Sequence, residues 1–348
     1  MKTTTAVAIS GGVDSLMAAH LLKKQGHRVV GLHFTTGYEQ QTIPIDTVAD
    51  QLGIESHVVD LRSEFSSAVV DYFVRTYRDG QTPNPCLVCN PVIKFGHLLV
   101  AARNLGADRL ATGHYARLHC DEDGRAHLLR AVDAVKDQSY FLAFLDQRQL
   151  QQACFPLGAY RKNDVKAMAA AAGYRPVTSG ESQDVCFIKG ASYSAFIEQH
   201  LDEAALPEVG DIVDVNGQIL GRHHGLHRYT IGQRRGLNCP ADEPYYVLQL
   251  DARNNRLVVG FRKETFTRQC RVTRLNWIQP TPGSSLRVHT RLRYRHRGAS
   301  STLQRPGADA VDGGDWTVRF DEPQAAVTPG QGAVFYRNDE VIGGGVIQ

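Results

Sequence analysis

The sequence has little that would place it outside the ordinary globular proteins of the cytoplasm. No apolar run reaches the length of a membrane-spanning helix, and no basic-then-apolar leader precedes the first expected strand. The seven cysteines are odd in number and widely scattered, which argues against a disulfide framework. We therefore expect a cytoplasmic location, no membrane partner, and cysteines that serve in catalysis, in metal binding or as buried thiols.

Length and composition are those of a protein with more than one core. A chain of 348 residues accommodates two or three domains, and 42% hydrophobic with 22% charged residues is an ordinary globular composition. The formal net charge of +3 by itself says little about partners. Helical periodicity gives way to short β-type runs between glycines from about residue 206 onward. We expect domain boundaries near residues 205 and 265.

The first part of the chain is predicted to be α/β. Apolar, β-branched runs at 4–9, 28–34 and 54–61 alternate with helical patterns at 45–52 and 63–77. This alternation is typical of a Rossmann-like parallel sheet covered by helices, in which ligands lie beyond the carboxyl ends of the strands. The expected domains are this α/β domain (1–205), a small central β domain (206–264) and a C-terminal β-barrel (265–348).

The segment SGGVDS at residues 10–15 lies between the first strand and a helix predicted over 16–25. Its glycines let the backbone turn tightly, and the N–H groups and dipole at the helix start favour a bound phosphate. Its serines add hydroxyl donors, and Asp14 is suited to hold Mg²⁺ against the phosphates. No Gly-Lys-Ser/Thr follows, so this is not a Walker A loop. A plain turn with an N-cap serine is the alternative.

Two further strands are predicted to end at the same edge of the sheet. Phe34 ends the second strand, where it either contacts an adenine or packs in the core. A strand predicted over 108–117 contains Gly113, which allows a ligand to approach closely. His114 comes next and is either a substrate contact or a structural hydrogen-bonding residue.

The segment TPNPCLVCN at residues 82–90 contains a Cys-x-x-Cys pair. Its two prolines predict an extended or turning loop, with a helix beginning only after it at Val92. Cys86 and Cys89 are interpreted as a redox pair, as half of a metal site, or as a nucleophile with a neighbour, with two inert thiols as the alternative. Cys186 follows a polar loop and is either their partner in space or buried filler.

Positive charge gathers in the last third of the chain. Between Arg268 and Arg305 there are nine arginines and no Asp or Glu. If the stretch 291–297 is a strand, its four arginines share one face, which suits a phosphate backbone and stacked bases. A second basic segment occupies 222–235. A merely solvated basic face is the alternative.

These motifs together resemble the tRNA-specific 2-thiouridylases, N-type ATP pyrophosphatases that carry an SGGxDS loop (a PP-loop). The resemblance covers nearly the whole chain and rests on SGGVDS, TPNPCLVCN, GHYAR (113–117), KDQSYFL (136–142), ESQDVCFI (181–188), IGQRRGL (231–237) and TPGQGAVFY (328–336). It implies a PP-loop domain, a small β domain and a C-terminal β-barrel. It also implies that ATP adenylates O2 of the wobble uridine of tRNA with release of pyrophosphate, and that sulfur then replaces this oxygen at C2. The implied cofactors are ATP and Mg²⁺, and the implied partners are tRNA and a sulfur donor, either a persulfide carrier protein or sulfide.

The resemblance also assigns roles to matching positions. ATP would be bound by Ala8, Ile9, Ser10, Gly11, Gly12, Val13, Asp14, Ser15, Phe34 and Gly113. The target base would be contacted by Asn84, Pro85 and Cys86, and the tRNA by His114, Lys136, Asp137, Gln138, Arg293, Tyr294 and Gln331. Cys89 would be the catalytic thiol and Cys186 the persulfide carrier, with a Cys89–Cys186 disulfide closing the cycle. The charge pattern adds Arg291, Arg295 and Arg297 as weaker tRNA candidates.

The chain departs from the family at three places. Cys86 stands where the family usually has aspartate, Phe34 stands where it has methionine, and the segment 33–39 is shortened. Cys86, Cys89 and Cys186 therefore offer a second sulfur route, in which three thiolates hold an iron–sulfur cluster that carries sulfide. The persulfide and cluster routes both stay open at this point. Another SGGxDS adenylating ligase and a non-catalytic tRNA-binding protein are the rival functions.

Overall fold

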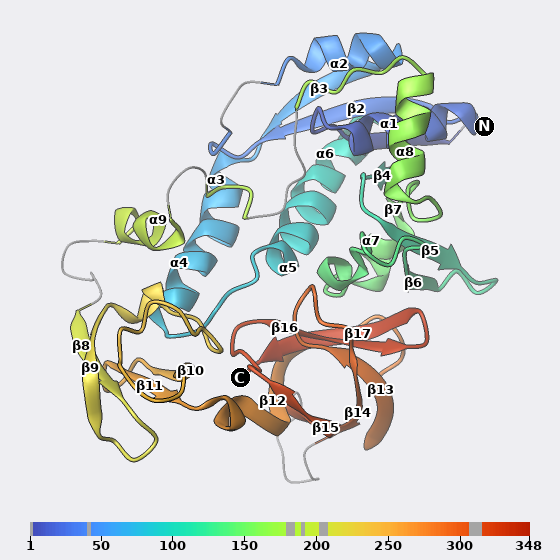
Figure 1. Ribbon diagram of the computed structural model, residues 1–348. Coiled ribbons are helices and arrows are strands. Elements are labelled where there is room, and N and C mark those ends of the chain that lie inside the picture. Colours follow the sequence, from blue (N-terminus) through green and yellow to red (C-terminus); the bar gives the residue numbers. More distant parts are fainter. Residues whose placement is uncertain (1–2, 40–42, 179–184, 189–191, 202–207, 306–314) are drawn as a thin grey trace.

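The computed structural model describes residues 3–39, 43–178, 185–188, 192–201, 208–305 and 315–348. These residues form a parallel sheet, a small mixed sheet and a large antiparallel sheet. Figure 1 shows the helix-covered parallel sheet at the top, with the small sheet and the barrel side by side below it. The predicted succession of an α/β fold, a small β unit and a β-barrel is confirmed.

The parallel sheet has the strand order β3-β2-β1-β4-β7, with β1 in the centre. The chain leaves β1 toward β2 on one side and later returns to β4 on the other, so the carboxyl ends of β1 and β4 form a switch point of the kind that binds ligands. The strands are β1 Thr4–Ala8, β2 Arg28–Thr35, β3 Glu55–Asp60, β4 Arg109–Ala111 and β7 Ala153–Cys154. Helices of this domain include α1 Val13–Lys24, α2 Ile45–Leu52, α7 Gln147–Gln151 and α8 Lys162–Ala171.

The sheet is buried on both faces. Ala6 and Val7, successive residues of β1, belong to different hydrophobic clusters because successive side chains of a strand point to opposite faces. Val7 packs with Leu16 and the rest of the apolar side of α1, whereas Ala6 packs with Leu32 and the long helices on the other face. This is why β1 reads as a continuous run of small apolar residues rather than an alternating pattern.

Two long helices each consist of three continuous segments. The first is α3 Arg62–Phe65, a π-helical turn Ser66–Val70 and α4 Asp71–Arg78; the second is α5 Cys86–Cys89, a π-helical stretch Asn90–Leu98 and α6 Leu99–Asn104. The prediction that the second helix begins only at Val92 was wrong, since it begins at Cys86. The Cys-x-x-Cys pair is therefore the first turn of a helix and not part of a loop.

Proline chemistry explains why the helix starts early. Pro85 is the N-cap residue, where no backbone N–H is needed. Pro91 lies inside the helix, and the wider π-helical register accommodates its missing N–H. The side-chain amide of Gln149 donates to the carbonyl oxygens of Pro91 at 2.7 Å and Phe95 at 3.1 Å, which supports the widened stretch from outside.

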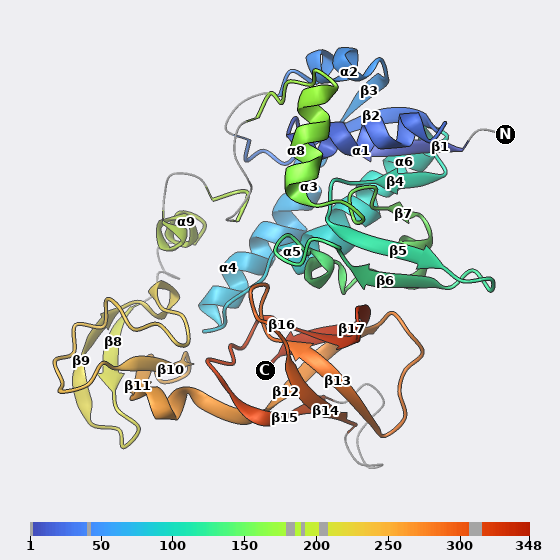
Figure 2. The same ribbon diagram turned by 45° about the vertical axis from the view of Figure 1, so that its right-hand side comes forward.

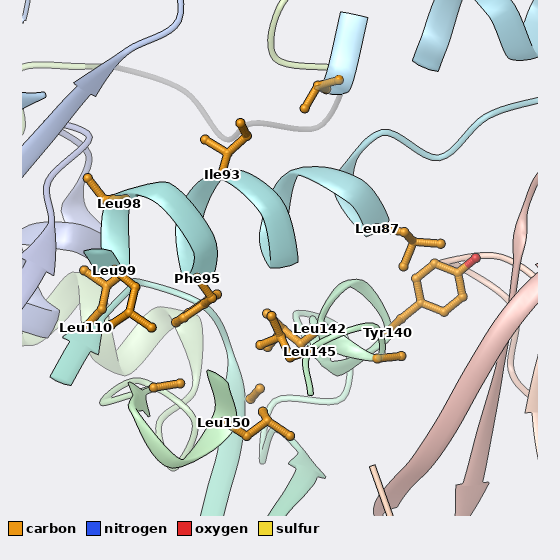
Figure 3. Packing of buried hydrophobic residues seen from close by; sticks show 14 of the residues in the cluster. Leu87, Ile93, Phe95, Leu98, Leu99, Leu110, Tyr140, Leu142, Leu145 and Leu150 are labelled. Atoms are coloured by element: carbon orange, nitrogen blue, oxygen red, sulfur yellow. The ribbon is translucent and has the colours of Figure 1, made fainter. Parts of the chain in front are cut away.

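By length and composition the stretch Cys86–Asn104 is long and apolar enough to cross a membrane, although 44% of it is buried inside the structure. Ile93, Phe95 and Leu98 are almost fully buried and belong to the main core cluster. Figure 3 shows this helix packed among Leu110, Leu142 and other apolar side chains of the domain. The stretch thus has the packing of a core helix.

The strand predicted over 108–117 is two strands. β4 ends at Ala111, and after the turn 112–115 the chain starts a hairpin of β5 Ala116–Cys120 and β6 Ala126–Arg130. The hairpin leaves the parallel sheet and pairs with β17 (Glu340–Ile347) of the C-terminal barrel, with Val341 opposite Leu128. The first domain and the barrel therefore share one continuous sheet.

The small sheet has the order β10-β11-β8-β9. Its strands are β8 Val209–Val213, β9 Ile219–His224, β10 Tyr246–Asp251 and β11 Arg256–Gly260. Ile212, Val247 and Leu257 are fully buried in its core. The preceding helix α9, Tyr193–Gln199, is tied to it through Glu198, whose carboxylate lies 2.8 Å from His227 Nε2.

Six described strands form a closed barrel at the C-terminal end, since β12 pairs with both β15 and β17. Figure 2 shows the barrel below the α/β domain. Its strands are β12 Phe266–Trp277, β13 Ser285–Arg291, β14 Ala299–Gln304, β15 Trp316–Ala325, β16 Gly332–Arg337 and β17 Glu340–Ile347. The assumption of a strand over 291–297 was wrong: β13 ends at Arg291, and 292–297 form a connecting loop.

Candidate active site

The glycine loop at residues 10–15 has its own internal hydrogen bonds. The Ser15 hydroxyl accepts from the Ser10 backbone N–H at 3.2 Å and donates to the Gly12 carbonyl at 2.9 Å. Gly11 has φ of +73°, and a Cβ there would lie 2.6 Å from Val177, so only glycine fits. Gly12 is the N-cap of α1, which leaves the first N–H groups of this helix available for an anion.

Asp14, in the first turn of α1, forms a half-buried cluster with two residues from distant parts of the chain. The Lys162 ammonium lies 2.7 Å from Oδ1 and 2.6 Å from Oδ2, and the Tyr115 hydroxyl donates to Oδ1 at 2.8 Å. The side chain of Lys162 is only 9% exposed. Sequence reasoning missed Lys162, because it opens the alanine-rich helix α8 and no local motif marks it.

Gly113 and Phe34 lie near the loop as the strand order requires. A Cβ on Gly113 would approach the Cβ of Asp14 to 2.9 Å and the backbone nitrogen of Ser15 to 3.2 Å, so the turn after β4 lies directly on the start of α1. Phe34 is half-buried at the carboxyl end of β2 and packs against the main core cluster. His33 holds the end of β1, since its Nδ1 lies 2.9 Å from the Ile9 carbonyl oxygen.

The continuous helix from Cys86 to Asn104 is called the cysteine helix below. Cys86 and Cys89 are half-buried on its first turn. The Cys89 backbone N–H donates to the Pro85 carbonyl at 2.8 Å, which closes this turn. Between the two cysteines, Leu87 is buried and points toward Tyr140 (Figure 3). The spacing of three residues places both thiols on neighbouring positions of one helical face.

Cys186 lies in the described segment 185–188, which packs against the same core as the cysteine helix. Phe187 is buried and makes edge contacts with Phe65 and Phe73, with ring centroids 5.7 Å and 5.2 Å apart. Cys186 itself is exposed, and its negative charge acts to raise the pKa of both Cys86 and Cys89. Cys89 and the neighbours of Cys186, Val185 and Ile188, pack against the same hydrophobic core, although Cys186 comes about a hundred positions later in the sequence than the Cys86–Cys89 pair.

The environment of the cysteine helix keeps its thiols protonated. Burial raises the pKa of Cys86 to about 11 and that of Cys89 to about 12, against the opposing positive charge of Lys94. Lys94 lies on the same helix and also acts, after burial, to lower the pKa of His114. Lys94 could not be recognised from the sequence while the two cysteines were expected on a loop. In a helix that begins at Cys86, this lysine lies little more than one turn after Cys89.

The cysteines do not form a ready metal site. Among the described residues, which include Cys86, Cys89 and Cys186, no group of three or more His, Cys, Asp or Glu side chains is placed to hold a metal ion. No disulfide joins the cysteines of the described chain either. The thiol arrangement does not fit an iron–sulfur cluster, and we derive no chemical step through one.

Several residues with expected contacts to base or tRNA are engaged inside the protein. His114 is buried, with its Nδ1 2.6 Å from the Thr112 hydroxyl. Asn84 is buried, and the Asn84 carbonyl accepts from the Leu87 backbone N–H at 3.1 Å. The side-chain oxygen of Gln138 accepts from the Tyr115 backbone N–H at 2.9 Å. Gln331 donates to the backbone of the loop before the cysteine helix.

Asp137 and Arg291 form a buried ion pair between the α/β domain and the barrel. Arg291 Nη1 lies 2.8 Å from Asp137 Oδ2, while the other carboxylate oxygen accepts from the backbone N–H groups of Ala131 and Ser139. Arg291 also donates to the carbonyl oxygens of Tyr294 and His296, so it shapes the loop that follows β13. It is therefore not available to tRNA in this arrangement.

The loop after Arg291 presents the remaining basic residues. Tyr294 stacks on Phe141 with ring centroids 4.5 Å apart. Arg293, Arg295 and Arg297 are exposed on this loop. Elsewhere in the basic stretch the barrel supplies its own counter-charges, since Arg271 of β12 pairs with Asp315, and Arg287 of β13 pairs with Asp321 of β15. Acidic partners from other parts of the barrel thus interrupt the predicted basic face, and three of its exposed arginines lie on the loop next to the segment KDQSYFL (136–142).

Comparison with known proteins matches most of this chain to three domain families. Residues 3–190 match the tRNA methyl transferase HUP domain, 194–261 the tRNA methyl transferase PRC-barrel domain, and 267–347 the aminomethyltransferase beta-barrel domain. The tRNA-specific 2-thiouridylase MnmA of Desulfosudis oleivorans is 49% identical over 99% of this chain and 94% of its own length. Those of Syntrophotalea carbinolica and Trichlorobacter lovleyi are 46% and 45% identical, over 98% and 99% of this chain and 97% of their own lengths. The chain is therefore an enzyme of the tRNA-specific 2-thiouridylase family.

Proposed function

We propose that this protein replaces O2 of the wobble uridine of tRNA by sulfur at the expense of ATP. The observation that carries the proposal is the joint presence, in one domain, of the glycine loop with its Asp14–Lys162 pair and of three neighbouring cysteines. The first arrangement supports activation of an oxygen by adenylation, and the second supports delivery of sulfur. A methyl transfer, which the name of the tRNA methyl transferase HUP domain suggests, would need neither.

The glycine loop would hold ATP for the first step. The N–H groups at the start of α1 face the phosphates, and Lys162 supplies a buried positive charge where negative charge develops on the leaving pyrophosphate. Mg²⁺ would be held by Asp14 together with the phosphates, and it would neutralise their charge. The uridine O2 attacks the α-phosphorus, the bond to the β-phosphate breaks, and the uridine is left with AMP on O2.

The cysteines would perform the second step by a persulfide relay. A persulfide carrier protein or another sulfane-sulfur donor loads Cys186, and the terminal sulfur of the Cys186 persulfide attacks C2 while AMP leaves. The Cys89 thiolate then attacks the Cys186 sulfur, breaks the sulfur–sulfur bond and releases 2-thiouridine. This step forms a Cys89–Cys186 disulfide, which an external dithiol must reduce before the next cycle. The packing of Cys89 and of Val185, the neighbour of Cys186, against the same hydrophobic core supports this pairing.

The basic loop after β13 would guide the tRNA to the site. Exposed Arg293, Arg295 and Arg297 suit phosphate contacts, and Tyr294 offers an aromatic ring next to Phe141. Because Tyr294 stacks on Phe141, the loop after β13 adjoins the segment that contains Lys136, Asp137 and Gln138. Their position between the α/β domain and the barrel is suited to an RNA that reaches into the cysteine site.

The decisive experiment is mass spectrometry of tRNA nucleosides after reaction with ATP, a sulfur source and unmodified tRNA. We expect 2-thiouridine with the native protein, none with Cys89→Ser, and native yield with Cys120→Ser, a control at an exposed cysteine of the β5–β6 hairpin. Cys89→Ser should retain release of pyrophosphate in the presence of tRNA. Pyrophosphate release without 2-thiouridine in the native protein would favour another adenylating ligase, and tRNA binding without pyrophosphate release would favour a non-catalytic protein.

A further inference from the structure

The connection between β15 and β16 of the barrel is hydrogen-bonded to the loop that leads into the cysteine helix. The Gln331 side-chain amide donates to the carbonyl oxygens of Thr82 at 3.0 Å and Pro83 at 3.1 Å. In the opposite direction, the Thr82 backbone N–H donates to the Pro329 carbonyl at 2.9 Å. These bonds join segments about 250 positions apart in the sequence, at a point four residues before Cys86.

Glycines in the barrel connection allow this close approach. Gly330 has φ of +90°, and a Cβ there would lie 2.7 Å from the Thr82 carbonyl oxygen. A Cβ on Gly332 would lie 2.6 Å from a methyl group of Leu87, the residue between Cys86 and Cys89. The Tyr140 hydroxyl donates to the Gly332 carbonyl at 3.0 Å and completes the contact. The barrel connection thus touches both the loop and the first turn of the cysteine helix.

Both sides of this contact are stiff. On the barrel side, the Gly330 N–H donates to the Ile347 carbonyl and the Ile347 N–H donates to the Gln331 carbonyl, which fastens the connection to the end of β17. On the other side, Pro83 and Pro85 restrict the backbone between Thr82 and the helix. A shift of the barrel connection is therefore transmitted to the cysteine helix rather than absorbed by the intervening residues.

We propose that Gln331 is a positioning residue that acts through the loop at 82–85 to hold Cys89 in place. A primary amide has two N–H donors, and in Gln331 they are used by the Thr82 and Pro83 carbonyls. This makes Gln331 a link between the barrel and the loop that leads into the cysteine helix. Only the kinetic part of the proposal rests on the proposed function.

The test uses the full-length protein with Gln331→Glu, which keeps the shape but replaces both donors by an oxygen that repels the two carbonyls. Alkylation of Cys89 by iodoacetamide is followed by peptide mass spectrometry, in the absence of tRNA and of a sulfur source. We expect the substitution to change the rate of this alkylation by about tenfold or more. In thiolation assays kcat should fall by about ten- to a hundredfold, because misplacement of a reacting group by about 1 Å has effects of this size. The KM for tRNA should stay within about twofold.

Gln348→Glu is the matched control, since Gln348 is exposed at the end of the same barrel and should leave all three measurements unchanged. Gln331→Ala removes the donors without adding charge and should give the same result as Gln331→Glu. If the Gln331→Glu protein does not fold, Gln331→Ala takes its place in the test. A raised KM for tRNA with native kcat and native Cys89 alkylation would overturn the proposal and make Gln331 a tRNA contact. An altered alkylation rate in a protein that makes no 2-thiouridine would support the link while refuting the proposed function.

Discussion

Lys162 and Asp14 form a two-point ion pair beside the glycine loop, with the Lys162 ammonium 2.7 Å and 2.6 Å from the two carboxylate oxygens. The pair joins the first turn of α8 to the first turn of α1, although the residues are 148 positions apart. It places a cation and an anion at the point where a nucleotide's phosphates would bind. Because the lysine side chain is buried and the carboxylate is one-third exposed, the two partners should respond differently to substitution.

Lys162→Ala should abolish activation while leaving the fold intact. Asp14 keeps its hydrogen bond from Tyr115 and its contact with solvent, so the carboxylate is not stranded. Loss of the buried cation should lower kcat for pyrophosphate release by about 10²–10³-fold, the usual effect of removing one preorganised charge stabiliser. A stopped assay of pyrophosphate release checks this. Native release rates would show that Lys162 has only a structural role.

Asp14→Ala should instead destabilise the protein. It leaves the Lys162 ammonium buried without its carboxylate, and an unpaired buried charge costs about 3–5 kcal/mol. Urea unfolding should therefore show a larger loss for Asp14→Ala than for Lys162→Ala. The reverse order would contradict the burial argument.

The cysteine helix should show a steep dependence of thiol reactivity on pH. Burial raises the pKa of the Cys89 thiol to about 12, so the thiolate, which is the reactive form, is scarce at neutral pH. The alkylation rate of Cys89 in the tRNA-free protein should rise about tenfold per pH unit from pH 7 to pH 10 without reaching a plateau.

Lys94→Ala should slow this reaction further at every pH, because the ammonium of Lys94 favours the thiolate and its removal raises the pKa of Cys89. Lys94→Arg retains the charge and serves as the matched control. A plateau below pH 8 in the native protein would contradict the assignment of a protonated resting thiol.

Asp137→Ala should weaken the junction between the α/β domain and the barrel. The substitution strands the buried Arg291 guanidinium, at a cost of about 3–5 kcal/mol in the free energy of unfolding. The double substitution Asp137→Leu with Arg291→Met should recover part of this loss, since no charge is then buried alone. Asp321→Ala breaks the exposed pair with Arg287 and should cost only about 0–1 kcal/mol. Chemical denaturation compares the three.

Phe187→Ala should separate sulfur transfer from activation. Phe187 is 4% exposed and holds the segment of Cys186 against Phe65 and Phe73, so truncation costs about 3–5 kcal/mol and loosens the position of the thiol. We expect the yield of 2-thiouridine to fall more than pyrophosphate release does. Phe266→Ala, at a 45% exposed position of the barrel, is the control for a general loss of aromatic packing. Equal losses in both assays would show that Phe187 serves stability alone.

Local sequence determined the elements and the class of chemistry. The apolar run of β1, the glycines at 11 and 12 and the start of α1 could be predicted because strand burial, positive φ and helix capping depend on neighbouring residues. The order of strands and helices likewise followed from periodicity, and the family resemblance followed from short motifs whose residues serve one function together.

Tertiary structure decided the partners of charged and polar side chains, which no local pattern contains. Lys162 pairs with Asp14, and Arg291 pairs with Asp137 instead of lying on an exposed basic face. Burying a charge without a partner is costly, and in both cases the fold supplies a carboxylate from a distant segment. Distant segments also supply the hydrogen bonds around the cysteine helix, since Gln149 donates to the Pro91 carbonyl and Gln331 to the Thr82 carbonyl. The sequence alone thus specified which residues carry the chemistry, whereas the packing of distant segments decided which of them stand ready for substrate and which hold the site together.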